Sequence, residues 1–184
     1  MIPASAFFFD CFGQRYPVGF RIVIMGVAGC GKSTVGAAIA AAEGLPLIEG
    51  DAFHSTESRD KMARGTPLTD ADRAQWLVTL GRQLAGHPQG VVLTCSALKR
   101  AYRDQLREAA PGLRFVVLEI AREAAQQRVA ARGSHFFSAS LVDSQFATLE
   151  SPAGEQGVLE VDALQPIDNV QRRVHAWLTE GDAA

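Results

Sequence analysis

The sequence has few cysteines, and they are not grouped. Cys11, Cys30 and Cys95 form neither a CxxC pair nor a cluster with histidine. Structural zinc sites and disulfide frameworks need several cysteines at paired or close spacings, so neither is expected here. A reducing compartment is the simplest location for such a chain, and the predicted location is the cytoplasm.

Long apolar runs and a strong net charge are also missing. No run approaches the roughly 20 apolar residues that cross a bilayer, and the formal net charge of the 184 residues is −2. We therefore expect no membrane binding and no nucleic-acid binding driven by overall charge. The Phe7–Phe9 run has no basic residue before it and is followed at once by Asp10, which is unlike a signal peptide.

Short apolar runs alternate with longer helical patterns, which predicts an α/β fold on a mostly parallel sheet. The runs are rich in Val, Ile and Leu without polar alternation, as expected for strands covered on both faces. The expected strands are Phe20–Met25, Leu45–Glu49, Val91–Cys95, Arg114–Ile120 and Gly157–Val161. The expected helices are Lys32–Glu43, Asp70 to Leu84 with Thr69 as N-cap, Ala97–Ala109, Arg122–Arg132 and a last one from about Asp168.

The strongest motif is GVAGCGKS at Gly26–Ser33, which fits the phosphate-binding pattern GxxxxGKS/T. It follows an apolar strand and precedes an Ala-rich helix, the context that a true P-loop needs. Its glycines let backbone N–H groups turn toward phosphate oxygens, and the helix start favours the same anion. Lys32 is expected to bridge the β- and γ-phosphates of ATP, and Ser33 to ligate Mg²⁺. The expected nucleotide contacts are Gly26, Val27, Ala28, Gly29, Cys30, Gly31, Lys32, Ser33 and Thr34.

Asp51 and His54 follow the second expected strand, and Ser96 follows the third. Ligands of open α/β sheets bind outside the carboxyl ends of the strands. Asp51 can orient an attacking hydroxyl, accept its proton and hold Mg²⁺ through water; capping a helix is its alternative role. His54 is either a structural hydrogen-bonding residue or a substrate contact. Ser96 is placed to meet Mg²⁺-bound water or substrate.

The basic residues after the third strand have two interpretations. One of Lys99 and Arg100 could pair with a substrate carboxylate, while the other lies on a solvated face. Arg103 and Arg107 are expected to form surface pairs with the acidic residues of their own helix.

Residues 121–156 are rich in Arg, Ser and small residues, and are a candidate lid. Arg128 and Arg132 are four residues apart and share a helix face, from which they could stabilise the charge of a transferring phosphoryl group. A solvent-exposed basic helix is the alternative. Phe136 and Phe137, next to His135, are expected to pack and to seat a closed lid.

These features together indicate a small-molecule kinase. A GTPase would need an NKxD-type guanine-reading motif, which the sequence lacks, and motor or ATPase domains are usually longer. The alternatives that remain are another P-loop kinase, such as one like shikimate kinase, and a nucleotide-binding module without catalysis. Shikimate kinases usually have a GGG stretch where this chain has Cys95–Ala97, and the intact Lys32, Ser33 and Asp51 argue against lost catalysis.

From about Phe20 to its C-terminus the chain resembles bacterial-type gluconokinases. The resemblance rests on blocks in the same order, of which the P-loop is generic and the CSALKRAYRDQLR and HFF blocks are specific. The blocks are MGVAGCGKST at Met25–Thr34, EGDAFH at Glu49–His54, KMARGTPLTDADRAQWL at Lys61–Leu77, CSALKRAYRDQLR at Cys95–Arg107, ARGSHFF at Ala131–Phe137 and SQFATLESP at Ser144–Pro152.

The resemblance implies Mg·ATP-dependent phosphorylation of the 6-hydroxyl of D-gluconate, and a homodimer. It also implies a nucleoside-monophosphate-kinase-like P-loop NTPase fold, with a five-stranded parallel sheet, flanking helices and a lid. Residues 20–184 would form this single domain, and residues 1–19 an extension outside the resemblance. The implied catalytic residues are Lys32, Asp51, Arg128 and Arg132. The family pattern gives Asp51, His54, Arg73, Lys99 and the lid arginines substrate or transition-state roles. With the other polar groups expected nearby, the predicted substrate contacts are Asp51, His54, Ser58, Arg59, Lys61, Arg73, Ser96, Lys99 and His135.

The chain departs from the family pattern at three positions near the expected substrate. Ser55 stands where the family usually has proline, Ser58 where it has asparagine, and Gln75 where a proline precedes Trp76. Ser58 still offers a hydroxyl group but has a shorter reach than asparagine.

Overall fold

The centre of the molecule is a parallel β-sheet, seen in a computed structural model that describes residues 7–9, 15–17, 19–131 and 139–180. Its five strands lie in the order β4-β5-β3-β6-β7, and every pairing is parallel. The strands are β3 (Arg21–Met25), β4 (Leu47–Glu49), β5 (Val91–Thr94), β6 (Arg114–Glu119) and β7 (Val158–Asp162). The sheet confirms the α/β class predicted from the apolar runs.

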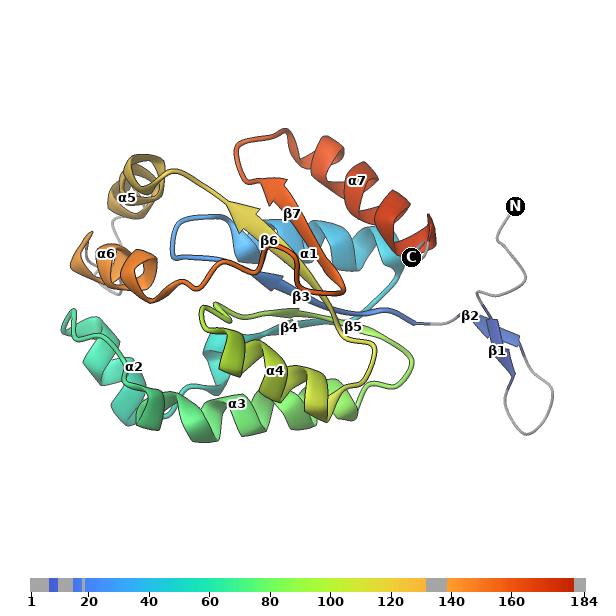
Figure 1. The fold of residues 1–184 in the computed structure, drawn as a ribbon, viewed down its shortest axis with the longest axis horizontal. Helices are drawn as coiled ribbons and strands as arrows, with labels where there is room; N and C mark the ends of the chain where they lie inside the picture. Colours follow the sequence, from blue (N-terminus) through green and yellow to red (C-terminus); the bar gives the residue numbers. More distant parts are fainter. Residues whose placement is uncertain (1–6, 10–14, 18, 132–138, 181–184) are drawn as a thin grey trace.

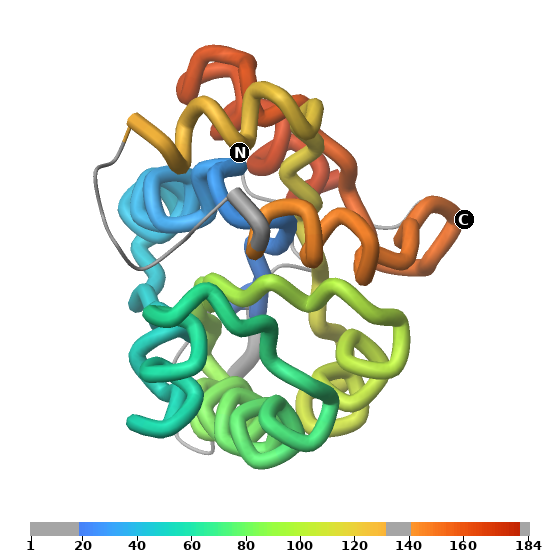
Figure 2. The backbone as a smooth tube through the Cα atoms, turned by 90° about the vertical axis from the view of Figure 1, so that its left-hand side faces the viewer, coloured from blue at the N-terminus to red at the C-terminus, as the bar shows by residue number. Residues whose placement is uncertain are grey.

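Helices cover both faces of the sheet (Figures 1 and 2). One layer holds α1 (Lys32–Glu43), α5 (Arg122–Ala131) and α7 (Ile167–Glu180), and the other α3 (Asp70–Ala85) and α4 (Arg100–Ala109). Neighbouring residues of β3 belong to different cores: Ile22 packs in the α1 and α7 core, and Val23 in the α3 and α4 core. Within the described ranges, no helix is both long and apolar enough to cross a bilayer.

The helix α3 begins with a complete capping box. The Thr69 hydroxyl accepts from the Asp72 N–H, and the Asp72 carboxylate accepts from the Thr69 N–H at 2.8 Å. The hydrogen bond from Lys61, and then those from Thr69, lower the pKa of Asp72 to about 2. The expected N-cap is therefore confirmed, and it sets the residue at which α3 begins.

Two expected elements begin later than the sequence suggests. The second strand starts at Leu47, because Pro46 has no N–H to donate and the Leu45 N–H closes the end of α1 on the Ala40 carbonyl. The helix expected from Ala97 starts at Arg100, because Ala97 has a φ of 44°, outside the helical region.

Several elements of the structure were not predicted from the sequence. They are the hairpin of β1 (Phe7–Phe9) and β2 (Arg15–Pro17), the 3-10 helix η2 (Gly50–Phe53), and the helices α2 (Thr56–Ala63) and α6 (Ala139–Thr148). Ser55 caps α2, and its hydroxyl accepts from the Ser58 N–H at 3.1 Å. The candidate lid, residues 121–156, therefore contains α5, α6 and a returning segment, 149–156.

Candidate active site

The P-loop connects β3 to α1. Gly31 is the N-cap of α1 with a left-handed φ of 101°, which favours glycine. At Gly29, with a φ of 84°, a Cβ atom would lie 2.6 Å from the Ala125 carbonyl oxygen, too close for any side chain. The two glycines thus let the loop turn and pass close to α5.

The loop offers polar groups to the space in front of it. The Lys32 ammonium donates to the Gly26 and Val27 carbonyls at 3.1 Å each. The Ala28 N–H donates to the side-chain carbonyl of Gln145, on α6, at 2.7 Å. In this structure the Ala28 amide is therefore bound to a side-chain oxygen of α6. Sequence reasoning did not single out Gln145, although it lies in the SQFATLESP block.

Ser33 lies beside a second acidic residue, Glu49. The Ser33 hydroxyl donates to the Glu49 carboxylate at 3.1 Å, and the same oxygen accepts from the Thr94 hydroxyl at 2.5 Å. Glu49 ends β4 and Thr94 ends β5, so the parallel sheet brings these two oxygens together at the carboxyl ends of the strands, where α1 adds Ser33. Such hard oxygen donors fit Mg²⁺, which takes one or two protein ligands and keeps several waters. Sequence reasoning did not single out Glu49, although it lies in the EGDAFH block.

Asp51 and His54 are held by η2 and Trp76. The Trp76 indole N–H donates to the Gly50 carbonyl at 2.8 Å, and the His54 ring stacks on Trp76 with centroids 4.3 Å apart. The Asp51 carboxylate is 65% exposed and lies 3.9 Å from His54 Nε2. Burial is the largest cause that lowers the pKa of His54, and Asp51 opposes it. Burial thus disfavours the charged form of the His54 ring.

One pocket collects much of the expected site. From the P-loop and the strand ends come Ala28, Gly29, Gly31, Lys32, Ser33, Asp51, His54 and Ser96. The remaining lining residues are Met62, Pro67, Leu68, Arg73, Val129, Leu141, Ser144 and Gln145. Arg73 lies on α3 and donates to the Leu68 carbonyl. The pocket therefore combines an anion-binding loop, an acid and a cation with apolar walls.

Four expected substrate contacts lie outside this lining. Ser58 is 5% exposed and accepts from the Ser55 hydroxyl, and Arg59 donates to the Ala52 carbonyl at 3.5 Å. Lys61 pairs with Asp72 at 2.6 Å, and Lys99 with Asp70 at 2.8 Å. Their substrate roles stay predictions, but the structure gives each side chain an intramolecular partner.

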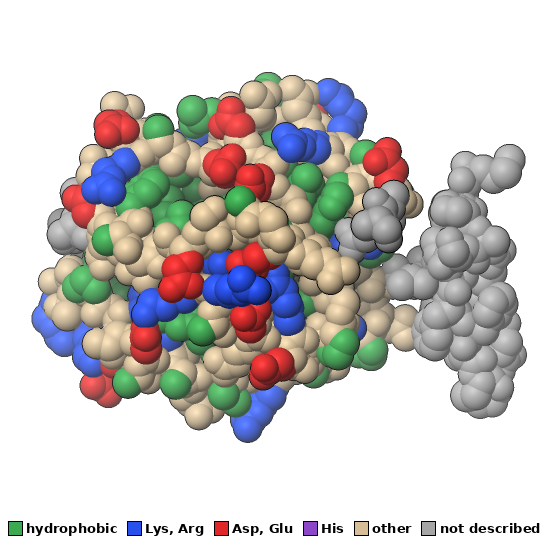
Figure 3. All heavy atoms as spheres, in the orientation of Figure 1, with side chains coloured by type: hydrophobic (Ala, Val, Ile, Leu, Met, Phe, Trp, Pro, Cys, Tyr) green, Lys and Arg blue, Asp and Glu red, His purple; other side chains and the backbone are tan. Residues whose placement is uncertain are grey.

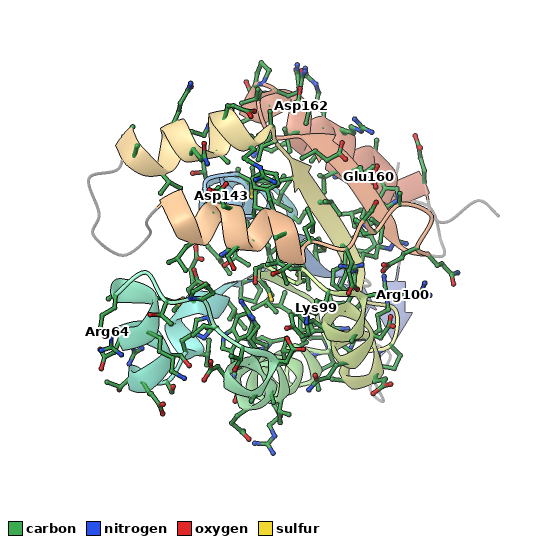
Figure 4. All side chains as sticks on the ribbon, turned by 60° about the vertical axis from the view of Figure 1, so that its left-hand side comes forward. Arg64, Lys99, Arg100, Asp143, Glu160 and Asp162 are labelled. Atoms are coloured by element: carbon green, nitrogen blue, oxygen red, sulfur yellow. The ribbon has the colours of Figure 1, made fainter. Side chains whose placement is uncertain are left out.

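The expected lid arginines are in part described. Arg128 donates to the Cys30 carbonyl at 3.4 Å and the Ala163 carbonyl at 3.3 Å, so its guanidinium lies against the P-loop. Arg122 pairs with Asp143 at 3.3 Å, and Figure 4 shows Asp143 on the side of α6 nearest α5. Arg132 and His135, like Phe136 and Phe137, lie outside the described residues.

The expectation of surface pairs for Arg103 is wrong. Its side chain is fully buried and pairs with Glu155, 2.5 Å away and on another segment. Arg107, by contrast, is partly exposed and contacts both Asp104 and Glu155. On the face shown in Figure 3, basic and acidic side chains are mixed rather than separated by sign.

Comparison with known proteins identifies the family. A family model described as an AAA domain matches residues 22–152. A gluconokinase of Gluconobacter oxydans is 46% identical over 145 residues, which is 76% of this chain and 80% of that protein. The thermoresistant gluconokinase of Escherichia coli is 40% identical over 152 residues, 80% of this chain and 87% of that protein.

The chain belongs to the gluconokinase family. A solved gluconokinase from Sinorhizobium meliloti 1021 has a TM-score of 0.81 to this structure at 48% identity, covering 89% of this chain and 95% of that one. The gluconokinase resemblance and the P-loop NTPase fold predicted from the sequence are thereby confirmed. The P-loop and the pocket at the carboxyl ends of the strands fit a member of this kinase family.

Proposed function

We propose that this chain uses ATP to phosphorylate the 6-hydroxyl of D-gluconate, giving 6-phospho-D-gluconate. The gluconokinase names of its relatives support the reaction. The observation that carries it is the pocket in which the P-loop, Asp51 and Arg73 face one space. A phosphate-binding loop, a base and a carboxylate-binding cation are the groups that phosphorylation of a sugar acid needs.

Asp51 is the proposed base. It lies at the carboxyl end of β4 with an exposed carboxylate, on the same pocket as the P-loop residue Lys32. From there it orients the acceptor hydroxyl toward the γ-phosphate and accepts its proton during transfer. His54 and Trp76 fix the backbone around it.

Arg73 is the proposed partner of the gluconate carboxylate. It is the single arginine among the described residues that line the pocket, and a guanidinium binds a carboxylate through two parallel hydrogen bonds. Ser96 and His54 line the same pocket and supply hydrogen-bonding groups for the hydroxyls. Met62 and Leu68 form an apolar wall that excludes water.

The phosphates of ATP are proposed to lie on the P-loop N–H groups, with Lys32 between the β- and γ-phosphates. Ser33 directly, and Asp51 through water, are the proposed holders of Mg²⁺, which neutralises phosphate charge when bound. Arg128, against the P-loop, and Arg132 are the proposed arginines that stabilise the transferring group. Closure of a lid within residues 121–156 would bring them onto it.

Acceptor assays test the reaction. ADP release is measured with ATP, Mg²⁺ and either D-gluconate, shikimate or no acceptor. We expect turnover with gluconate at least about tenfold above both other arms, because a site built to hydrogen-bond one acceptor leaves its polar groups unpaired with another. Turnover with shikimate alone would reject the gluconate assignment, and tight ATP binding without turnover would support a non-catalytic nucleotide-binding module.

Replacing Asp51 tests the proposed base. Asp51→Asn should lower kcat by roughly 10²- to 10⁴-fold, the usual contribution of a general base, and should leave the Kd for ATP within about twofold, because the P-loop is intact. Stopped assays and calorimetric titration measure the two quantities. Asp60→Asn, an exposed acid on α2, is the matched control. A variant at Asp51 that kept more than about a tenth of kcat would contradict the role.

The homodimer and the cytoplasmic location stay predictions from the sequence and the family resemblance. Sedimentation of the purified chain and fractionation of cells test them.

A further inference from the structure

The loop between β5 and α4 contains a strained residue. Ala97 has a φ of 44°, and it is the one non-glycine residue with a positive φ among those described. L-residues with a Cβ atom avoid this left-handed region, which glycine enters freely. Ala97 and Leu98 are both fully buried. Something in the surrounding structure must therefore hold this conformation.

The strained residue lies next to the pocket. Its neighbour Ser96 lines the pocket, and the Ser96 carbonyl accepts from the N–H of Gly26, the first P-loop residue, at 3.4 Å. Because the Ser96 carbonyl belongs to the peptide that joins Ser96 to Ala97, the conformation at Ala97 bears directly on how this carbonyl meets the P-loop.

The group that holds this loop is the buried guanidinium of Arg103. One of its nitrogens, Nη1, donates to the carbonyls of Ala97 at 2.9 Å and Leu98 at 3.1 Å. Nε and Nη2 donate to the Glu155 carboxylate at distances from 2.5 to 3.1 Å. All three guanidinium nitrogens therefore donate hydrogen bonds, either to the loop or to Glu155.

The returning segment 149–156 fixes the same loop from its other side. The Glu150 N–H donates to the Leu98 carbonyl at 2.8 Å, and the Glu150 carboxylate accepts from the Arg100 N–H at 2.6 Å. Figure 4 shows Arg100 and Lys99 at the start of α4, where this segment passes. The loop is thus clamped between α4 and a segment more than 50 residues away.

A buried ion pair is weak evidence for a purely stabilising role, because desolvation offsets much of its attraction. Here the guanidinium does something that an apolar side chain of the same volume could not do. It supplies donors to two carbonyls that the strained backbone turns inward, and Glu155 balances its charge.

We propose that Arg103, with Glu155, is a positioning residue that holds Ala97 in its left-handed conformation and so presents Ser96 to the acceptor and to the P-loop. It touches no substrate itself. The kinetic part of the proposal rests on the proposed function, because its assay uses gluconate as acceptor.

The kinetic test combines a weakened clamp with a relaxed backbone. Arg103→Lys keeps the charge but cannot reach both carbonyls and Glu155, and should lower kcat by roughly tenfold or more with the Kd for ATP little changed. Ala97→Gly alone should leave kcat near the wild-type value. In the double variant glycine adopts the positive φ without a clamp, so kcat should return to within about threefold of wild type.

The matched control is Arg107→Lys, because Arg107 contacts the same Glu155 but neither carbonyl of the loop. It should keep its kcat, and all variants are assayed well below their unfolding midpoints. If Arg103→Lys lowers only the unfolding midpoint, or if Ala97→Gly fails to restore kcat, Arg103 is structural and the proposal is overturned.

Hydrogen exchange tests the positioning without any acceptor. The Gly26 N–H, which donates to Ser96, should exchange at least about tenfold faster in Arg103→Lys than in wild type, and Arg107→Lys should leave it unchanged. If the wild-type chain does not phosphorylate gluconate, the proposed function fails and this measurement alone decides. Unchanged exchange at Gly26 in Arg103→Lys would overturn the positioning role.

Discussion

His54 combines burial with an unsatisfied nitrogen. Its Nδ1 is buried and has no hydrogen-bond partner among the described residues, while its ring stacks on Trp76. A buried polar atom without a partner lowers stability unless a ligand or water satisfies it. The ring as a whole lines the pocket, and its contact with substrate stays a prediction.

The lowered pKa of His54 predicts how stability depends on pH. Burial lowers it, with Arg73 and Arg59 acting in the same direction and Asp51 against them. As the pH falls below the ordinary value of 6.5, His54 binds a proton more readily in the unfolded chain than in the folded one. The free energy of unfolding should therefore decrease as the pH falls below 6.5. The slope from one such group reaches at most about 1.4 kcal/mol per pH unit.

Urea unfolding between pH 5 and 8 measures this slope. His54→Gln should flatten the part that begins near pH 6.5, while His87→Gln, a histidine outside the pocket lining, should keep the wild-type profile. Equal slopes in wild type and His54→Gln would show that His54 titrates normally in the folded protein.

Local sequence was enough to find some site residues and not others. Lys32 and Asp51 are marked by a motif and by the end of an apolar run, and both line the pocket. Glu49 and Gln145 acquire their positions through contacts with Ser33 and Ala28, which are 16 and 117 residues away. No local pattern encodes such pairings, because they depend on how strands and helices are arranged in space.

Among the elements, α3 is held at its first residue, Asp70, by hydrogen bonds from Lys99 and Tyr102. The first residue of α3, Asp70, accepts from Lys99 at 2.8 Å and from the Tyr102 hydroxyl at 2.5 Å. The hydrogen bond from Lys99, and then that from Tyr102, lower the pKa of Asp70. Since Arg73 lies one turn further along α3, this contact with α4 sets where the proposed carboxylate-binding cation lies.

This contact predicts a modest effect for Lys99. Lys99→Ala should raise the KM for gluconate by roughly two- to fivefold, whereas loss of a direct charged ligand would cost roughly thirtyfold or more. Asp70→Asn should have the same effect, and the double variant should be no worse than either single one, because both remove one interaction. Steady-state kinetics with gluconate measure all three.

Arg100→Ala is the matched control for Lys99, since its side chain is 71% exposed and, within the described part of the chain, its ion pair is with Asp104, one helical turn away. Its KM should stay at the wild-type value. A large rise for Lys99→Ala with no effect of Asp70→Asn would instead support the substrate contact that the sequence predicted.

Some element boundaries were predicted from the sequence and others were not. The range of α1, Lys32–Glu43, was predicted in full, because Gly31 and Gly44 mark its ends. The helix α4 starts at Arg100, three residues after the predicted start, because the carbonyls of Ala97 and Leu98 accept from Arg103 and not from helix N–H groups. The short, polar α2 has no apolar period to reveal it, and only one of its residues is buried.

At the scale of the whole molecule, the N-terminal hairpin is separate from the catalytic fold. The strands β1 and β2 pair with each other and not with the five-stranded sheet. Figure 1 shows them at the end of the molecule away from the loop between β3 and α1. The division into an extension, residues 1–19, and a kinase domain, residues 20–184, stays a prediction.

Deleting residues 1–18 should therefore leave catalysis intact. We expect kcat and the KM for gluconate to stay within about twofold of the full chain, because hairpins of two strands contribute little stability by themselves. Kinetics and thermal unfolding of the two chains side by side make the comparison. A fall of kcat by about tenfold or more after deletion would show that catalysis depends on the hairpin.

The clamp on Ala97 also has a consequence for synthesis on the ribosome. The P-loop, Asp51, Arg73 and Arg103 are all translated before Glu155, which lies 52 residues after Arg103. A nascent chain that ends before Glu155 therefore lacks the carboxylate half of the clamp. The loop around Ala97 gains its full set of contacts only once this late segment has been made.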